Sequence, residues 1–207
     1  MRRSMVGGVA LVALGLANPA LAAVEAQHVA KKLGVRDDPE AGLDVRLGLG
    51  GLTGSLGDDT KVGPLLGIVA EVTPWKYVGI EAGYELQRNA IDRRRIGEEG
   101  EGLWRNGLGV LAKVGPYVEE KWRPFVGVGF GVNYFNPSDG ADDVYRNDWT
   151  TDIPLAAGVE YRFGHLFAGV RATYHLMGGE DIVDRPGTDE RAHGGALNGN
   201  LSVGGRF

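Results

Sequence analysis

The sequence contains no cysteine among its 207 residues, which excludes disulfide bonds, thiol chemistry and lipid attachment at a cysteine. Histidine is scarce as well, and His28, His165, His175 and His193 are too dispersed to match a transition-metal site. Lys and Arg together number 22 against 27 Asp and Glu, so the formal net charge is −5. Because nucleic acids are bound by basic surfaces, this balance predicts no nucleic-acid partner.

Long apolar runs are missing beyond the N-terminus. No segment after residue 22 approaches the roughly 20 uncharged apolar residues of a membrane-spanning helix, which excludes a helical membrane protein. The first residues are typical of an export signal: Arg2 and Arg3 precede an apolar run over 5–16, and residues 20–22 form a small-x-small cleavage motif. We predict cleavage after Ala22.

From residue 43 to the end, apolar and polar residues alternate with a period of two, which is typical of strands with one apolar and one polar face. The segment lengths approach the roughly 9–11 residues of a tilted strand that crosses a bilayer. Leu111 and Phe167 interrupt the alternation. The pattern predicts an all-β fold, an eight-stranded antiparallel up-and-down transmembrane β-barrel. Its strands are expected at residues 43–49, 66–72, 78–86, 104–114, 126–134, 152–163, 166–176 and 197–207.

The connections between these segments alternate between long and short. Outer-membrane barrels have long loops outside and short turns in the periplasm, so the alternation places the N-terminus in the periplasm. Long polar stretches fall at 53–61, 88–102, 136–151 and 177–192, and short ones at 73–76, 116–121 and 164–165. The predicted organisation is a signal peptide at 1–22, a periplasmic N-terminal segment at 23–41 with a short helix over 24–33, and the barrel domain at 42–207.

Aromatic residues gather where the two membrane interfaces are expected. Amphipathic rings favour the headgroup region, although aromatic residues also have a general preference for strands. The predicted interface aromatics are Trp75, Tyr77 and Trp122 at the periplasmic end, and Tyr84, Trp104, Tyr134 and Trp149 toward the outer end.

The last segment, residues 197–207, alternates up to the final residue and ends on Phe207. It resembles the C-terminal strand of bacterial outer-membrane barrels, and Leu201, Val203 and Phe207 are its expected barrel-assembly signal. With the export signal, the eight strands and the loop alternation, the chain resembles the small outer-membrane β-barrel proteins, the group that includes the OmpA membrane domain, OmpX and OmpW. The resemblance implies a monomer spanning the outer membrane, with outer-membrane lipid, lipopolysaccharide and the barrel-assembly machinery as partners. No wall-anchoring domain is expected after the barrel.

The polar faces of the predicted strands carry acids and bases in equal number. Unpaired charges in a narrow lumen would cost several kcal/mol each, so we expect a salt-bridged interior that fills the barrel. A narrow or gated pore is the alternative. The predicted interior network is Asp44, Arg46, Glu71, Glu81, Glu85, Arg105, Lys113, Glu160, Arg162, Arg171, His175 and Arg206, and Asp152 also faces inward.

Enzymatic and metal sites receive weak support. His175, Ser202 and Glu160 all face inward and could form a Ser-His-acid set, but a lipid-facing or rim position would be needed to reach an acyl chain. The acidic loop at 137–143 is expected to be solvated, with weak Ca²⁺ or Mg²⁺ binding as the alternative. The run at 93–95 is expected to contact lipopolysaccharide phosphates or to pair with nearby glutamates.

We therefore expect a non-enzymatic integral outer-membrane protein with an envelope-structural or surface-interaction role through four extracellular loops. No cofactor is expected, and any surface ligand stays unidentified. The first alternative is a narrow pore or a transporter of small hydrophobic molecules, and the second is a lipid-modifying outer-membrane enzyme. A secreted, lipocalin-like barrel is disfavoured because its inward face should be apolar.

Overall fold

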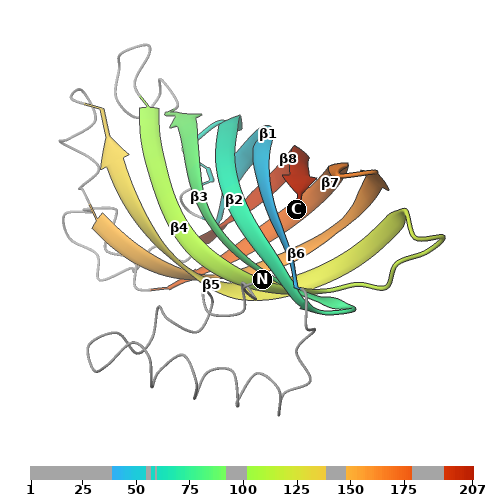
Figure 1. Ribbon diagram of the computed structural model, residues 1–207. Helices are drawn as coiled ribbons and strands as arrows, with labels where there is room; N and C mark the ends of the chain where they lie inside the picture. Colours follow the sequence, from blue (N-terminus) through green and yellow to red (C-terminus); the bar gives the residue numbers. More distant parts are fainter. Residues whose placement is uncertain (1–38, 55–56, 59, 92–101, 139–147, 179–193) are drawn as a thin grey trace, which may run out of the picture.

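The structure is a computed structural model that describes residues 39–54, 57–58, 60–91, 102–138, 148–178 and 194–207. Its strands form one closed antiparallel barrel, in which each strand pairs with its sequence neighbours and β1 pairs with β8 (Figure 1). The predicted fold is confirmed. The strands are β1 (Glu40–Gly54), β2 (Gly63–Trp75), β3 (Val78–Ala90), β4 (Gly102–Val114), β5 (Trp122–Pro137), β6 (Asp148–Phe163), β7 (Leu166–Gly178) and β8 (Gly194–Arg206).

The predictions for the N-terminal 38 residues lie outside the described part of the chain. They comprise the signal peptide at 1–22, most of the segment at 23–41 and the helix over 24–33. The basic run at 93–95 and most of the acidic loop at 137–143 also lie outside it. Within the described ranges, no helix is long and apolar enough to cross a membrane.

The strands are longer than the alternating segments that predict them. β3 continues to Ala90 and β5 to Pro137, so both run into stretches expected to be loops. The reason is that the inward polar side chains there still find partners: Asn89 donates to Gly50 O (2.9 Å) and Lys61 O (2.8 Å). At the other end, β1 begins at Glu40, two residues inside the predicted N-terminal segment.

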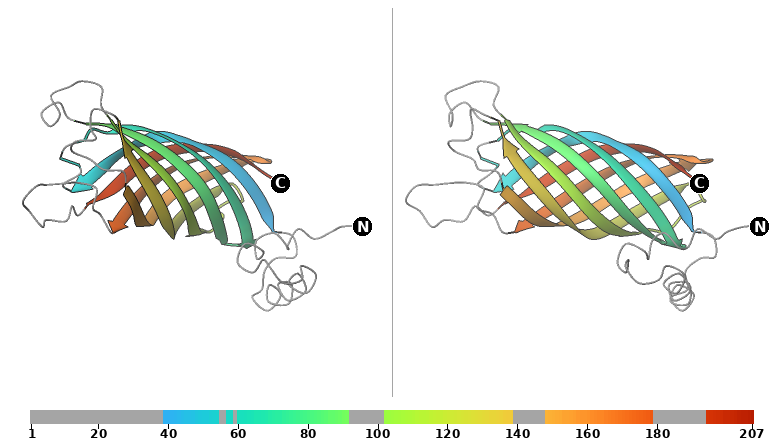
Figure 2. Two further views of the ribbon diagram at one scale, coloured as in Figure 1. Left: turned by 90° about the vertical axis from the view of Figure 1, so that its left-hand side faces the viewer. Right: turned by 60° about the vertical axis from the view of Figure 1, so that its left-hand side comes forward.

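Three short turns mark one end of the barrel, here called the short-turn end; the opposite end is the long-loop end. The turns span residues 76–77, 115–121 and 164–165. Glu119 and Glu120 have φ of 52° and 58°, a left-handed conformation that L residues rarely adopt, within a tight turn closed by Val118 and Trp122. The last residue, Phe207, exchanges backbone hydrogen bonds with Ala41, and Figure 2 shows the C-terminus at the end where β1 begins.

The two faces of the wall invert the pattern of a soluble protein. Outward apolar side chains are exposed, as in Leu47 (62%), Leu108 (67%) and Val126 (64%), whereas charged side chains face inward and are buried. An apolar belt of this kind matches the hydrocarbon of a bilayer. Leu111 and Phe167 are buried inside the barrel, so the strand geometry is regular where the sequence pattern is interrupted.

The predicted interface aromatics lie on the outer face at different heights. Trp75 and Trp122 are at the short-turn end of their strands and Tyr77 is in the turn after β2, whereas Trp104, Tyr134 and Trp149 are toward the long-loop end. Tyr84 is instead midway along β3, at 43% exposure, and its hydroxyl donates to Asn106 Oδ1 at 2.6 Å on β4. In hydrocarbon this bond satisfies two polar groups that no water would reach.

Replacing Tyr84 with phenylalanine is therefore expected to lower the free energy of unfolding by about 1–2 kcal/mol, because Asn106 loses its partner. Urea unfolding in lipid vesicles, followed by tryptophan fluorescence, measures the change. Tyr77→Phe is the control, since the Tyr77 hydroxyl has no hydrogen-bond partner among the described residues. Equal losses in both variants would contradict a specific role for the Tyr84 hydrogen bond.

Candidate functional site in the polar lumen

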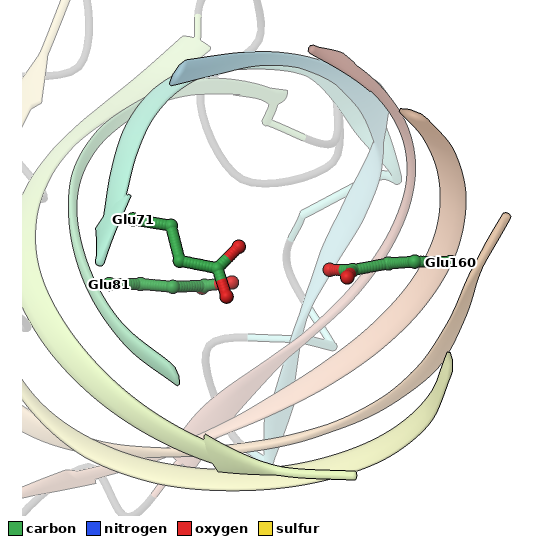
Figure 3. A group of neighbouring side chains, drawn as sticks. All are labelled: Glu71, Glu81 and Glu160. Carbon is green, nitrogen blue, oxygen red and sulfur yellow. The ribbon is translucent and has the colours of Figure 1, made fainter. Parts of the chain in front are cut away.

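The centre of the lumen near the short-turn end is occupied by one ammonium group. Lys113 Nζ on β4 lies 2.9 Å from Glu71, 2.9 Å from Glu81 and 2.5 Å from Glu160. Figure 3 shows these three carboxylates directed toward each other, from β2 and β3 on one side and β6 on the other. Lys113 is 0% exposed, so the contact lies in the barrel interior. Because its partners come from β2, β3 and β6, it joins opposite walls of the barrel.

Arginines complete this ion-pair cluster. Arg171 binds both oxygens of Glu81, at 2.8 Å and 2.7 Å, and Arg46 binds Glu81 at 3.0 Å. Two fork-shaped guanidinium groups and one ammonium therefore neutralise a single carboxylate. Further pairs are Arg46 with Asp44 (2.9 Å), Arg123 with Glu71 (2.9 Å) and Glu160 (3.8 Å), and Arg206 with Glu160 (2.8 Å) and Glu71 (3.3 Å).

The three glutamates have a spacing that could suit a metal ion, since one oxygen of each lies within 4.8 Å of the others. The ammonium of Lys113 already contacts all three, however, and four arginines surround them. The cluster holds five cationic and four acidic side chains. A further divalent ion would add positive charge where cations are in excess, so these residues do not fit a metal site.

Aromatic rings pack against the cations of this cluster. The Phe125 ring lies 5.1 Å from Lys113 Nζ and 4.8 Å from the Arg171 guanidinium carbon, both measured to the ring centroid. Arg206 lies 4.9 Å from the Phe167 ring in the same way. Such contacts stabilise buried cations and fix where they lie. Phe125 itself covers Gly158, its cross-strand partner on β6.

A second group of polar side chains, the histidine cluster, lies nearer the long-loop end. Its members are Glu85, Arg105, Asn133, Asp152, His175 and Asn198. Arg105 donates to Glu85 at 3.1 Å and to Asn133 at 3.2 Å, and Asn133 donates to Asp152 at 2.8 Å. Asp152 also contacts His175 Nδ1. With its amide oriented to satisfy both ends, Asn198 accepts from Arg105 Nη2 at 2.9 Å and faces His175 Nε2 at 3.3 Å.

A cavity of about 70 Å³ borders both clusters. It is lined by Arg46, Glu81 and Arg171 from the ion-pair cluster and by Glu85, Arg105 and His175 from the histidine cluster, among others. At the short-turn end, a second and more open hollow of about 740 Å³ forms a vestibule, with Glu40, Tyr117 and Arg162 in its lining. The cavity and the vestibule have no described lining residue in common.

Most of the residues predicted for the interior network lie in these two clusters. Arg162 does not: it lies at the mouth because β6 ends one residue later, and it pairs with Glu40 at 2.9 Å where both side chains are about 30% exposed. Glu85 is only partly buried because it borders the cavity. The residues of the predicted barrel-assembly signal are exposed on the outward face of the barrel, where they would contact lipid: Leu201, Val203 and Phe207.

Sequence reasoning missed Arg123 of the ion-pair cluster and Phe125, whose ring packs against two of its cations. Arg123 and Phe125 are buried at 0% and 5% exposure. They precede the expected start of the fifth strand at 126, because Pro124 between them obscures the alternation. The spacing of Arg123, Phe125, Gly127 and Gly129 at every second position was the available signal.

The candidate Ser-His-acid set is not assembled. His175 contacts Asp152 and Asn198, both in the histidine cluster. Ser202 lies instead beside Gly169, close to the side chain of Glu160 in the ion-pair cluster. The hydroxyl and the imidazole are therefore in different layers of the lumen.

The family model described as "Outer membrane protein beta-barrel domain" matches residues 9–207. A search of curated proteins found no match. Among solved structures the chain is similar to Neisserial surface protein A, at 15% identity and a TM-score of 0.57 over 82% of this chain and 97% of that one. It is similar to OprG from Pseudomonas aeruginosa, at 11% identity and 0.51 over 82% and 94%, and to the outer membrane enzyme PagL, at 15% and 0.45 over 78% and 97%. At these identities the likeness shows the fold alone.

Proposed function

The chain belongs to the outer membrane protein beta-barrel domain family and is an outer-membrane protein, and from this premise we propose a non-enzymatic barrel with a closed lumen. Its role is envelope-structural or surface-interacting, with the short turns in the periplasm and the four long loops at the cell surface. It functions as a monomer, embedded in outer-membrane lipid and lipopolysaccharide after insertion by the barrel-assembly machinery.

The single observation that carries this proposal is the ion-pair cluster. Lys113 from β4 contacts Glu71 on β2, Glu81 on β3 and Glu160 on β6, so side chains of opposite walls meet in the middle. Arg123 and Lys113 are fully buried. A hydrated ion would have to break several buried pairs to pass, which is costly in a low-dielectric interior.

The loops are the part of the molecule left free to bind partners. A barrel whose lumen is filled by side chains can act as a rigid support, and binding functions commonly reside in loops held by such a scaffold. The loop residues at 92–101, 139–147 and 179–193 lie outside the described part of the chain.

Enzymatic activity is disfavoured by the layer separation of His175 and Ser202 and by their position. Both side chains are buried within the lumen, at 7% and 8% exposure, and neither is on the lipid-facing surface. A lipid-modifying enzyme needs its nucleophile within hydrogen-bond reach of a base and within reach of an acyl chain.

We expect no ion conductance from the refolded protein in planar bilayers. Insertion is first established by the slower or faster gel mobility of unboiled protein relative to boiled protein, because a closed barrel resists unfolding until heated. Reproducible conductance steps that change in the Arg171→Ala variant would contradict the closed lumen and favour a narrow pore.

A further inference from the structure

The vestibule at the short-turn end extends from the mouth of the lumen over the rim of the barrel. Its inner side includes Glu40 and Arg162, which form an ion pair at 2.9 Å. Its outer edge includes Tyr161 and Phe163, which take the outward positions of β6 on either side of Arg162. The volume of about 740 Å³ falls within the roughly 300–1,000 Å³ of ligand pockets. The vestibule therefore has a polar side, an aromatic edge and room for a ligand.

The turn between β4 and β5 brings two exposed carboxylates to the same hollow. Glu119 and Glu120 both line it, and neither side chain has a partner among the described residues. Both have a positive φ, in a turn where Lys121 N donates to Val118 O. Asn or Gly suits such positions, and a glutamate is strained there. The presence of two carboxylates where Asn and Gly would be more stable favours a binding role for them.

A ligand that fits this hollow has to be both basic and amphipathic. A purely apolar ligand would cover Glu119 and Glu120 without a counter-charge, and a purely polar one would leave the aromatic edge without apolar contacts. Lys76 and Lys121 are also in the lining, but neither forms a described ion pair with these glutamates. Lys76 packs instead over the Tyr77 ring, 5.2 Å from its centroid.

The chain itself has such a segment beside the hollow. β1 begins at Glu40, which is in the lining, so residues 23–38 join the barrel at this rim. In the sequence, four small or apolar residues of this segment have the i, i+3, i+4, i+7 spacing of one helix face: Ala26, Val29, Ala30 and Leu33. Three bases follow without an acid between them: Lys31, Lys32 and Arg36.

The connection to the barrel is short enough for the segment to reach the hollow. Leu33 and Glu40 are seven positions apart in the sequence. Since an extended chain spans at most about 3.6 Å per residue, Leu33 can lie up to roughly 25 Å from Glu40. A short flexible connection also gives an effective concentration on the order of millimolar, so that weak contacts suffice for docking.

We propose that the vestibule is the docking site of residues 24–36 of the same chain. The apolar side of this segment contacts Tyr161 and Phe163 at the rim, and its lysines pair with Glu119 and Glu120. This docking goes beyond the proposed function and does not depend on whether the lumen conducts ions.

A thiol introduced on the segment measures the docking, because the chain has no cysteine of its own. The chain from residue 23 onward is refolded in phosphatidylcholine vesicles with Ala30→Cys, and the rate of its reaction with an uncharged maleimide is measured. Reversing the charge of the turn, with Glu119→Lys and Glu120→Lys, is expected to raise this rate about tenfold. The control is Asp58→Lys, an exposed position between β1 and β2 at the long-loop end, which is expected to leave the rate unchanged.

Reversing the charges on both sides tests whether the segment and the turn bind each other. Lys31→Glu with Lys32→Glu is expected to speed labelling in the unchanged barrel. Combined with the two lysine substitutions in the turn, it is expected to restore slow labelling.

A further variant separates the stability of the turn from its role in docking. Glu119→Asn with Glu120→Gly removes both carboxylates and gives the turn the residues that positive φ favours. This variant is expected to resist higher urea concentrations than the unchanged protein and yet to label fast. Slow labelling in this variant would contradict a role for the two carboxylates.

Three results would overturn the proposal. Fast labelling of the unchanged protein would mean that the segment does not dock. Slow labelling that ignores the charges of the turn would place the segment on the lipid surface, and slow labelling only at high protein concentration would mean docking onto a second copy.

Heat-dependent gel mobility selects the variants that fold. If the turn variants do not fold, Lys31→Glu with Lys32→Glu still tests the docking, because these substitutions leave residues 39–207 unchanged. Conductance of the unchanged protein would refute the proposed closed barrel and would leave the labelling result as it is.

Discussion

Replacing Glu81 with alanine is expected to lower the free energy of unfolding by about 3–5 kcal/mol, because the loss strands buried cations. Glu81 binds Arg171 through both oxygens and also contacts Arg46 and Lys113. It is 3% exposed, so water cannot replace the missing carboxylate. The cluster, already one cation in excess, would be left with five cations and three carboxylates.

Urea unfolding in lipid vesicles measures this loss, with the four tryptophans of the chain as the fluorescent signal. The matched control is Glu40→Ala, which breaks the partly exposed pair with Arg162 at the mouth and a longer contact of 3.8 Å with Arg206. Exposed pairs contribute little, and the control is expected to change stability by less than about 1 kcal/mol. If both variants lost the same small amount, the interior carboxylates would have to be solvated rather than paired.

Gly158→Ala is expected to lower the free energy of unfolding by about 2–3 kcal/mol, because it forces an overpacked contact. The added methyl carbon would lie closest to the backbone oxygen of Val170 on β7, and 2.7 Å from Phe125 Cζ and 2.9 Å from Phe125 Cε1. Phe125 cannot move freely, since Lys113 and Arg171 pack against its ring. A single methyl group would therefore displace the backbone of β7, the Phe125 ring, or both.

The control for this prediction is Gly199→Ala on β8. A methyl group there would meet nothing within 4 Å, and the position faces outward. Because alanine restricts the unfolded chain more than glycine does, this variant is expected to be unchanged or slightly more stable. A loss at Gly199 as large as that at Gly158 would mean that backbone propensity, and not the contacts with Val170 and Phe125, determines the effect.

The number of strands, their order and the inward direction of the charges follow from the alternating pattern. A period of two assigns every residue to a face once the strand is recognised. It does not assign a partner. Glu71 and Arg206 are 135 positions apart in the sequence, and their contact at 3.3 Å depends on the closure of the barrel and on the register of its strand pairs.

Residues at the ends of strands were harder to predict than those in the middle. The alternation begins at Arg123, Phe125 and Glu40, beside a proline or a turn. At these positions the alternating segment is too short to be recognised as part of a strand. Arg162 has the inward face that the pattern predicts, but only the position of the strand end shows that it reaches the mouth. The division into two clusters and the position of the cavity depend on how side chains from several strands pack together. The alternation along one strand contains no information about that packing.

The wide separation of the paired charges along the chain has a consequence for the order of biogenesis. Arg206 is the last charged residue and binds Glu71 on β2 and Glu160 on β6, so two earlier strands depend on the final one. Until β8 docks between β7 and β1, a partly formed sheet presents unpaired charges on one face. Such a sheet would be strongly unfavourable in hydrocarbon. Strand closure must therefore precede, or coincide with, the passage of this face into the membrane.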